Sequence, residues 1–139
     1  MTKTVADVMT RDPVAMDGKE PVAKAAAAMR DHGIGTVVVM KDGTPCGVVT
    51  DRDITVKAVA TGSDPSKMPL EQICSKSVVA VSPNQSVDDA VQVMKSHDVK
   101  RVLVMEGKEL KGIVSLGDLA SRGMEGDLER DLSRARANN

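Results

Sequence analysis

The chain of 139 residues contains no phenylalanine, tyrosine or tryptophan, so no aromatic side chain is available for a core or for stacking on a base. Valine, alanine, leucine, isoleucine and nine methionines must fill the core instead, and methionine adapts to irregular gaps. The net charge is −1, so there is no basic excess to attract nucleic acid. Together, the charge and the missing aromatics disfavour a nucleic-acid-binding protein.

Cysteine and long apolar runs are also scarce. The two cysteines, Cys46 and Cys74, form no CxxC pair, and two isolated thiols are typical of a reducing compartment. No apolar run approaches the length of a membrane span, and the first residues lack an apolar signal segment. We therefore expect a cytoplasmic protein with no membrane partner.

What the chain does contain is an internal repeat. Residues 8–55 match residues 73–120 at a constant offset of 65 positions, without a gap. The identical pairs least explained by a valine- and alanine-rich composition are His32/His97, Gly47/Gly112 and Asp53/Asp118. A repeat of this length is a supersecondary unit that needs a partner to bury its apolar face. We therefore expect the copies to form a pair, with two related clefts at their junction.

Both copies predict the same order of elements. A helical lead-in (5–9; 70–74) precedes a short apolar strand (13–16; 78–81) and an amphipathic helix. In the first copy, Pro21 suits the first position of this helix. In the second, Ser86 followed three residues later by Asp89 is typical of a capping box.

The second half of each copy predicts a strand hairpin and another helix. The runs Val37–Met40 and Val102–Met105 are continuously apolar, which indicates strands covered on both faces. Turns are predicted at Asp42-Gly43 and Glu106-Gly107, then strands from Gly47 and Gly112, then helices after Thr50 and Ser115. The unit is β-α-β-β-α, a mixed α/β fold, and its first connection should be a right-handed crossover between parallel strands.

These elements predict four segments along the chain. Residues 1–62 form the first repeat, residues 63–69 a linker rich in turn-forming residues, and residues 70–123 the second repeat. Residues 124–139 are a charged tail, for which both a short helix and a frayed end are compatible with the pattern.

A hydroxyl residue followed three positions later by aspartate recurs after the last strand of each copy, as Thr50-x-x-Asp53 and Ser115-x-x-Asp118. One interpretation is helix capping. The other is a ligand site, because a helix N-terminus suits phosphate and a nearby carboxylate accepts hydrogen bonds from ribose hydroxyls. Spacing alone leaves both open.

The two copies resemble a tandem pair of cystathionine-β-synthase (CBS) domains, often called a Bateman module. The resemblance rests on residues 12–16 and 29–34, and above all on Gly47–Ile54 and its second copy, Gly112–Leu119. It implies two β-α-β-β-α repeats packed sheet to sheet about a pseudo-two-fold axis. It also implies adenosine-containing ligands such as AMP, ADP, ATP, S-adenosylmethionine or NAD-type molecules, with no obligatory cofactor.

The resemblance also assigns residues to these clefts. Asp53 and Asp118 correspond to ribose ligands, and Thr50 and Ser115 to ribose or phosphate contacts. The basic residues are Arg101 and Lys100, expected near phosphate, and Arg52 in the first repeat. With no aromatic side chain to stack on it, the base would lie between aliphatic walls, for which the candidates are Val14, Val79, Ile34 and Val99.

The function implied is a non-catalytic regulatory module that binds an adenosine nucleotide between its repeats and signals to an unidentified protein partner, as a homodimer. No Walker loop, nucleophile–base pair or metal-ligand set is evident in the sequence. The alternative is a protein-interaction module with vestigial clefts. His32 and His97 favour a structural role at helix ends over metal binding. Cys46 and Cys74 favour packing over nucleophilic chemistry.

Overall fold

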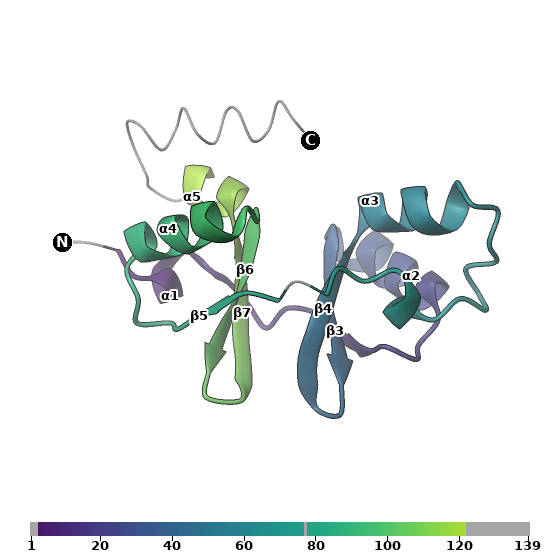
Figure 1. Ribbon diagram of the computed structural model, residues 1–139, viewed down its shortest axis with the longest axis horizontal. Helices are drawn as coiled ribbons and strands as arrows, with labels where there is room; N and C mark the ends of the chain where they lie inside the picture. Colours follow the sequence, from purple (N-terminus) through teal and green to yellow (C-terminus); the bar gives the residue numbers. More distant parts are fainter. Residues whose placement is uncertain (1–2, 77, 122–139) are drawn as a thin grey trace. The chain divides into compact units, whose positions relative to one another are not determined.

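The computed structural model describes residues 3–76 and 78–121 (Figure 1). The chain forms two compact units. The continuous unit is Pro13–Val78, and the split unit combines residues 3–12 with residues 79–121. The charged tail predicted at residues 124–139 lies outside the described residues.

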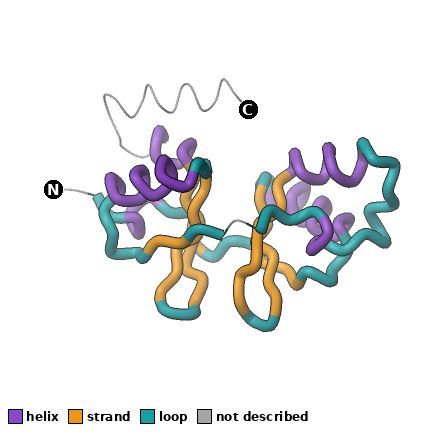
Figure 2. Tube along the Cα trace, in the orientation of Figure 1, coloured by secondary structure: helices purple, strands orange, loops and turns teal. Residues whose placement is uncertain are grey.

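The continuous unit has a three-stranded mixed sheet in the order β2-β3-β4, with β2 parallel to β3 and β3 antiparallel to β4 (Figure 2). Its elements are β2 (Ala15–Asp17), α2 (Val22–His32), β3 (Thr36–Lys41), β4 (Thr44–Thr50), α3 (Asp51–Ile54), the π-helix η1 (Thr55–Val59) and the 3₁₀ helix η2 (Leu70–Gln72).

The split unit repeats this arrangement and adds one strand, in the order β1-β7-β6-β5. Its elements are α1 (Val5–Val8), β1 (Thr10–Arg11), β5 (Ala80–Val81), α4 (Val87–His97), β6 (Arg101–Glu106), β7 (Glu109–Ser115) and α5 (Leu116–Ser121). Strands β5 and β6 are parallel, and β6 and β7 are antiparallel. The predicted β-α-β-β-α order is therefore confirmed in both copies.

The long helices begin and end where local chemistry favours it. Ser86 Oγ accepts a hydrogen bond from the Asp89 backbone N–H at 3.0 Å, as the capping pattern predicts. Helix α2 begins at Val22, so Pro21 is its N-cap and not its first helical residue. Pro21 stays extended because it is paired with Pro69 in an isolated β-bridge.

The central strands form the apolar core of each unit. Val37, Val38 and Val39 are completely buried, which confirms that β3 is covered on both faces. The first hairpin turns at Asp42 and Gly43, both with positive φ. In the second hairpin the turn falls on residues 107–108, one position later than predicted, because Glu106 still pairs with Glu109.

The lead-in segments do not pack with the repeats that follow them in the chain. Strand β1 pairs with β7, joining Thr10 to Ile113, so residues 3–12 belong with the second repeat. At the equivalent position 65 residues later, Ser75 bridges Val48 of the first repeat. Each sheet thus pairs with the lead-in of the other repeat, so the compact units are not the same segments as the predicted repeats, 1–62 and 70–123.

This pairing explains the glycine shared by the repeats. A Cβ atom at Gly47 would collide with the Ser75 carbonyl oxygen, and one at Gly112 would lie 2.8 Å from the Thr10 carbonyl oxygen. A glycine in a strand often marks such a close approach of another backbone. Gly47 and Gly112 are therefore required by the lead-in segments that cross them.

The predicted linker is docked against the continuous unit. The backbone N–H of Val22 donates to the Met68 carbonyl at 2.8 Å, and that of Ala23 donates to the Pro65 carbonyl at 2.9 Å. Residues 63–69 thus satisfy donors in the first turn of α2 that have no partner within the helix.

Candidate functional site

The topology places the predicted ligand residues of each unit at one end of its sheet. Strands β2 and β3 are parallel and start at this end, while the antiparallel β4 finishes there. Val14 precedes β2, Ile34 precedes β3, and Thr50 ends β4 opposite Thr36. In the split unit the corresponding residues are Val79, Val99 and Ser115.

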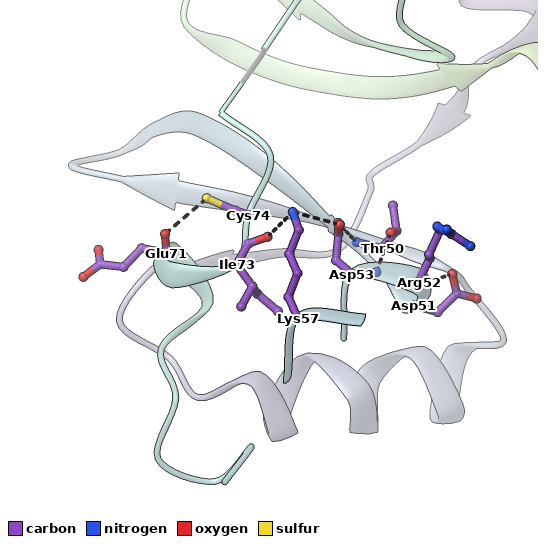
Figure 3. A network of polar contacts seen from close by, with 8 residues as sticks. All are labelled: Thr50, Asp51, Arg52, Asp53, Lys57, Glu71, Ile73 and Cys74. Atoms are coloured by element: carbon purple, nitrogen blue, oxygen red, sulfur yellow. Dashed lines mark hydrogen bonds and ion pairs between the residues drawn. The ribbon is translucent and has the colours of Figure 1, made fainter. Parts of the chain in front are cut away.

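In the continuous unit, Thr50 and Asp53 form a reciprocal capping box at the start of α3 (Figure 3). The Thr50 backbone N–H donates to Asp53 Oδ2 at 2.9 Å, and the Asp53 backbone N–H donates to Thr50 Oγ1 at 3.1 Å. The capping interpretation of this pair is therefore confirmed. A carboxylate has about four acceptor positions, so capping through one oxygen is compatible with a ligand at the other.

The split unit builds the same geometry at the start of α5. The Ser115 backbone N–H donates to Asp118 Oδ2 at 2.9 Å, and the Asp118 backbone N–H donates to Ser115 Oγ at 3.1 Å. Both hydroxyl–aspartate pairs are partly buried, so neither is a fully hydrated surface cap.

The cations differ between the two sites. Arg101 is exposed and begins β6 directly opposite Ser115, and the Lys100 carbonyl accepts the Leu116 backbone N–H at 3.0 Å. The corresponding residues of the continuous unit are Gly35 and Thr36, which carry no charge. Arg101 and Lys100 thus belong to the split unit.

In the continuous unit, the cation that contacts the aspartate is one that sequence reasoning missed. Lys57 Nζ lies 3.2 Å from Asp53 Oδ1 and also donates to the Ile73 carbonyl at 3.2 Å (Figure 3). Lys57 follows Asp53 by four residues, a spacing that favours ion pairs on a helix and was available as a signal. Arg52, the cation predicted for this unit, is exposed on α3, the short helix that also contains Asp53.

The four predicted apolar residues are half-buried and pack against the core of their own unit. Val14 and Ile34 contact the core of the continuous unit, and Val79 and Val99 that of the split unit. Two apolar side chains thus lie beside the hydroxyl–aspartate pair's end of the sheet in each unit.

The remaining candidates are the two histidines shared by the repeats. His32 and His97 are the exposed last residues of α2 and α4, where the helix dipole favours a histidine. Across residues 3–76 and 78–121, no three histidine, cysteine, aspartate or glutamate side chains are placed to hold a metal ion. Over the same residues, no helix is long and apolar enough to span a membrane.

Comparison with known proteins agrees with the doubled fold. The CBS domain model matches residues 5–59 and again residues 70–125. The CBS domain-containing protein YhcV of Bacillus subtilis (strain 168) is 34% identical over 124 residues, covering 89% of this chain and 88% of YhcV. The chain therefore belongs to the CBS domain family, with two copies of the domain.

Two solved structures show the same architecture. The crystal structure of Hypoxic Response Protein I with two coordinated zinc ions superposes with a TM-score of 0.74 at 31% identity, covering 88% of this chain and all of that one (100%). A hexameric CBS-CP12 protein from bloom-forming cyanobacteria superposes with a TM-score of 0.76 at 27% identity, covering 99% of this chain and 85% of that one.

Proposed function

We propose that this protein is a non-catalytic regulatory module that binds an adenosine-containing nucleotide and signals to a protein partner. One observation carries the proposal: the same partly buried hydroxyl–aspartate pair is built twice, with matching hydrogen bonds, at the same end of two equivalent sheets. Membership in the CBS family supports it, because CBS domains commonly bind adenine nucleotides.

In this proposal each aspartate holds a ribose. Asp53 and Asp118 accept hydrogen bonds from the vicinal hydroxyls while keeping their backbone contacts. The base lies against the apolar pair of its unit, Val14 with Ile34 or Val79 with Val99, and its edge is read by backbone groups. No aromatic side chain is present, so base recognition depends on apolar contact and hydrogen bonds.

The two sites should differ in their preference for phosphate. Arg101, beside Ser115, supplies an exposed guanidinium that can form bidentate hydrogen bonds to phosphate oxygens. Lys100, the preceding residue, adds a second cation. In the continuous unit, Lys57 is already paired with Asp53, and Arg52 is the remaining cation of the set. We therefore expect the split unit to bind nucleoside phosphates more tightly than the continuous unit.

Titration calorimetry with AMP, ADP, ATP, NAD and S-adenosylmethionine tests the proposal. At least one ligand should bind, and Asp118→Ala should weaken it. As a first check, the purified protein can be examined for bound nucleotide by absorbance and mass spectrometry, because a chain without tryptophan or tyrosine absorbs little in the near ultraviolet. If no ligand binds and none is co-purified, the two aspartates are helix caps only.

The matched control is Asp7→Ala. Asp7 Oδ2 accepts the Thr4 backbone N–H at 2.9 Å, so this variant removes a capping carboxylate of the same type in the same unit. Both variants lose a cap, but only Asp118 belongs to the proposed site. If the two variants bind the ligand with equal affinity, Asp118 is not part of the proposed site.

A second candidate function, protein interaction with vestigial ligand sites, is favoured by one observation. Val56 and Val59, three residues apart on the π-helix, are 47% and 62% exposed, and they are two of the three large hydrophobic residues exposed in the described part of the chain. We propose that this surface contributes to self-association as a homodimer, for which the hexameric CBS-CP12 structure is a precedent in assembly. Light scattering of the wild-type protein and of Val59→Ser tests this, and a wild-type monomer at all concentrations contradicts it.

A further inference from the structure

The two cysteines, which are unrelated by the repeat, lie together in the continuous unit. Strand β4 has a bulge in which Val39 pairs with Gly47 and Met40 pairs with Pro45, leaving Cys46 as the extra residue. A bulge breaks the strict alternation of side chains, so Cys46 packs on the core that also contains Cys74. The Cys74 thiol donates a weak hydrogen bond to the Glu71 carbonyl at 3.7 Å, and the pKa of Cys74 is raised by burial and in part by the nearby Cys46 thiol.

The close crossing of the lead-in segment brings Cys74 to this position. Cys74 Sγ lies 3.1 Å from where a Cβ atom of Gly47 would be, one residue from Cys46. Ser75, the next residue, makes both backbone hydrogen bonds to Val48, at 2.9 and 3.1 Å. Backbone pairing and core packing therefore hold Cys74 Sγ against β4, beside the residue that follows Cys46.

The two thiols differ in exposure, which gives them different roles in oxidation. Cys46 is half-buried, whereas Cys74 is buried, with 8% of its surface exposed. Burial, followed by the charge of a neighbouring Cys46 thiolate, raises the pKa of the Cys74 thiol above its ordinary value. Cys46 is thus the thiol that an oxidant reaches first.

We propose that Cys46 and Cys74 form a reversible intramolecular disulfide, making the continuous unit a redox-sensitive module. The oxidant is a low-molecular-weight disulfide such as oxidised glutathione. The Cys46 thiolate attacks one sulfur of this disulfide and releases one thiolate, which leaves a mixed disulfide on Cys46. The Cys74 thiolate then attacks the Cys46 sulfur and releases the second thiolate. The protein loses two electrons and two protons, and the small disulfide is reduced to two thiols.

The bond would fix the lead-in segment on β4. Residues 70–75 otherwise rely on backbone hydrogen bonds and packing, and the disulfide adds a covalent link across the Val48–Ser75 bridge. The Ile73 carbonyl, adjacent to Cys74, accepts a hydrogen bond from Lys57, which pairs with Asp53 (Figure 3). Oxidation of Cys74 therefore occurs one residue from Ile73, whose carbonyl is hydrogen-bonded to the lysine that pairs with Asp53. Only this last connection rests on the proposed nucleotide site.

The test is equilibration of the full chain in glutathione buffers of graded redox ratio, followed by acid quenching, alkylation with N-ethylmaleimide and intact mass spectrometry. The expected product is a monomer with a mass lower by two hydrogens and no alkylated thiol. Peptide mapping should join Cys46 to Cys74. The equilibrium constant against glutathione should be at least about ten-fold higher in the native chain than in urea, because native structure holds the thiols together.

Single substitutions define the two roles. In Cys74→Ser, oxidation should stop at a glutathione adduct on Cys46. In Cys46→Ser, the native chain should take up little glutathione, because Cys74 is buried. An intermolecular disulfide, a stable adduct on wild-type Cys46, or an equilibrium constant no higher in native protein than in urea would overturn the proposal.

Calorimetric unfolding gives a second readout. The oxidised protein should melt roughly 5 °C or more above the reduced protein, and an unchanged melting temperature contradicts the fixing of the lead-in segment. Nucleotide titration of the two redox forms is a separate measurement. A protein that binds no nucleotide but forms the internal disulfide disproves the proposed function and leaves the redox proposal standing.

Discussion

The continuous unit and the split unit have one backbone plan and different chemistry. The pairings of their hairpin strands agree position by position, including the bulge after Val39 and its counterpart after Val104. At the bulge, however, the continuous unit has Cys46 where the split unit has Lys111. Cys74 lies beside Gly47 in the continuous unit, and Met9 holds the equivalent position beside Gly112 in the split unit. A Cβ atom at Gly112 would lie 2.7 Å from the Met9 sulfur.

The comparison separates residues that the fold requires from residues it leaves open. Gly47 and Gly112 agree because a backbone crosses each of them, and Asp53 and Asp118 agree because each caps a helix. The thiol pair of the continuous unit and Arg101 of the split unit have no counterpart in the other copy. Function specific to one unit is therefore best sought at these unmatched positions.

The largest effect is expected at the crossing glycines. Gly47→Ala should destabilise the protein by about 3 kcal/mol or more, because its Cβ meets the Ser75 carbonyl, a backbone atom that cannot move without breaking the Val48 bridge. Gly112→Ala should cost less, about 1–3 kcal/mol, because its Cβ would lie 2.8 Å from the Thr10 carbonyl oxygen, a milder backbone clash, and the nearer Met9 side chain is flexible. Urea unfolding followed by circular dichroism measures both, and equal losses would show that the two crossings are equally rigid.

The next effect concerns ligand affinity in the split unit. Asp118→Ala should weaken nucleotide binding about ten- to a hundred-fold, as expected for a charged hydrogen bond of ~1.5–3 kcal/mol. Lys100→Ala should cost only ~0–1 kcal/mol, because a flexible lysine near water contributes little. Calorimetry compares the two. If Asp53→Ala and Asp118→Ala both leave affinity unchanged, the ligand contacts other residues.

The third prediction is a pH dependence confined to the continuous unit. The pKa of Cys74 is raised above 9.0 in the folded protein, chiefly by burial, so the unfolded chain loses its thiol proton first as pH rises. The unfolded state then binds fewer protons, and stability of the reduced protein should fall above about pH 9. Cys74→Ala should remove this component. Unfolding curves at successive alkaline pH values test it, and parallel losses in both proteins would assign the effect to other groups.

The smallest effect compares two ion pairs with the same spacing and the same N–O distance, 3.2 Å. Lys57→Met should destabilise by less than ~1 kcal/mol, and Lys24→Met by less still. Lys57 also donates to the Ile73 carbonyl and pairs with a shielded Asp53, whereas the Lys24–Glu20 pair is exposed on both sides. A larger loss in Lys24→Met would show that the Ile73 contact contributes nothing.

Sequence reasoning predicted the elements of the fold well, because their signals are local and occur twice. The buried runs at Val37–Met40 and Val102–Met105 identified the central strands, and Ser86 identified the start of α4. The exchange of lead-in segments was missed, because it depends on pairings such as Thr10 with Ile113, distant in sequence. Gly47 and Gly112 were the local signs of the two crossings.

For the candidate site, the sequence predicted the caps but does not distinguish a cap from a ligand contact. The pattern of a hydroxyl residue followed three positions later by aspartate also occurs at Thr4 and Asp7, where it builds a capping box at an exposed helix start. The ribose role of Asp53 and Asp118 therefore stays a prediction. The proximity of Cys46 and Cys74 was missed because it follows from a bulge and a crossing segment, neither of which has a thiol-specific pattern.

The division of the split unit has a consequence for synthesis on the ribosome. Pro13–Val78 is uninterrupted, so this unit has all its strands and its crossing segment once Val78 has left the exit tunnel. Residues 3–12 are synthesised before this unit, yet their sheet partner β7 is synthesised after it. Residues 3–12 therefore have no sheet partner while the continuous unit is being synthesised, and they can pair only after β7 has been made.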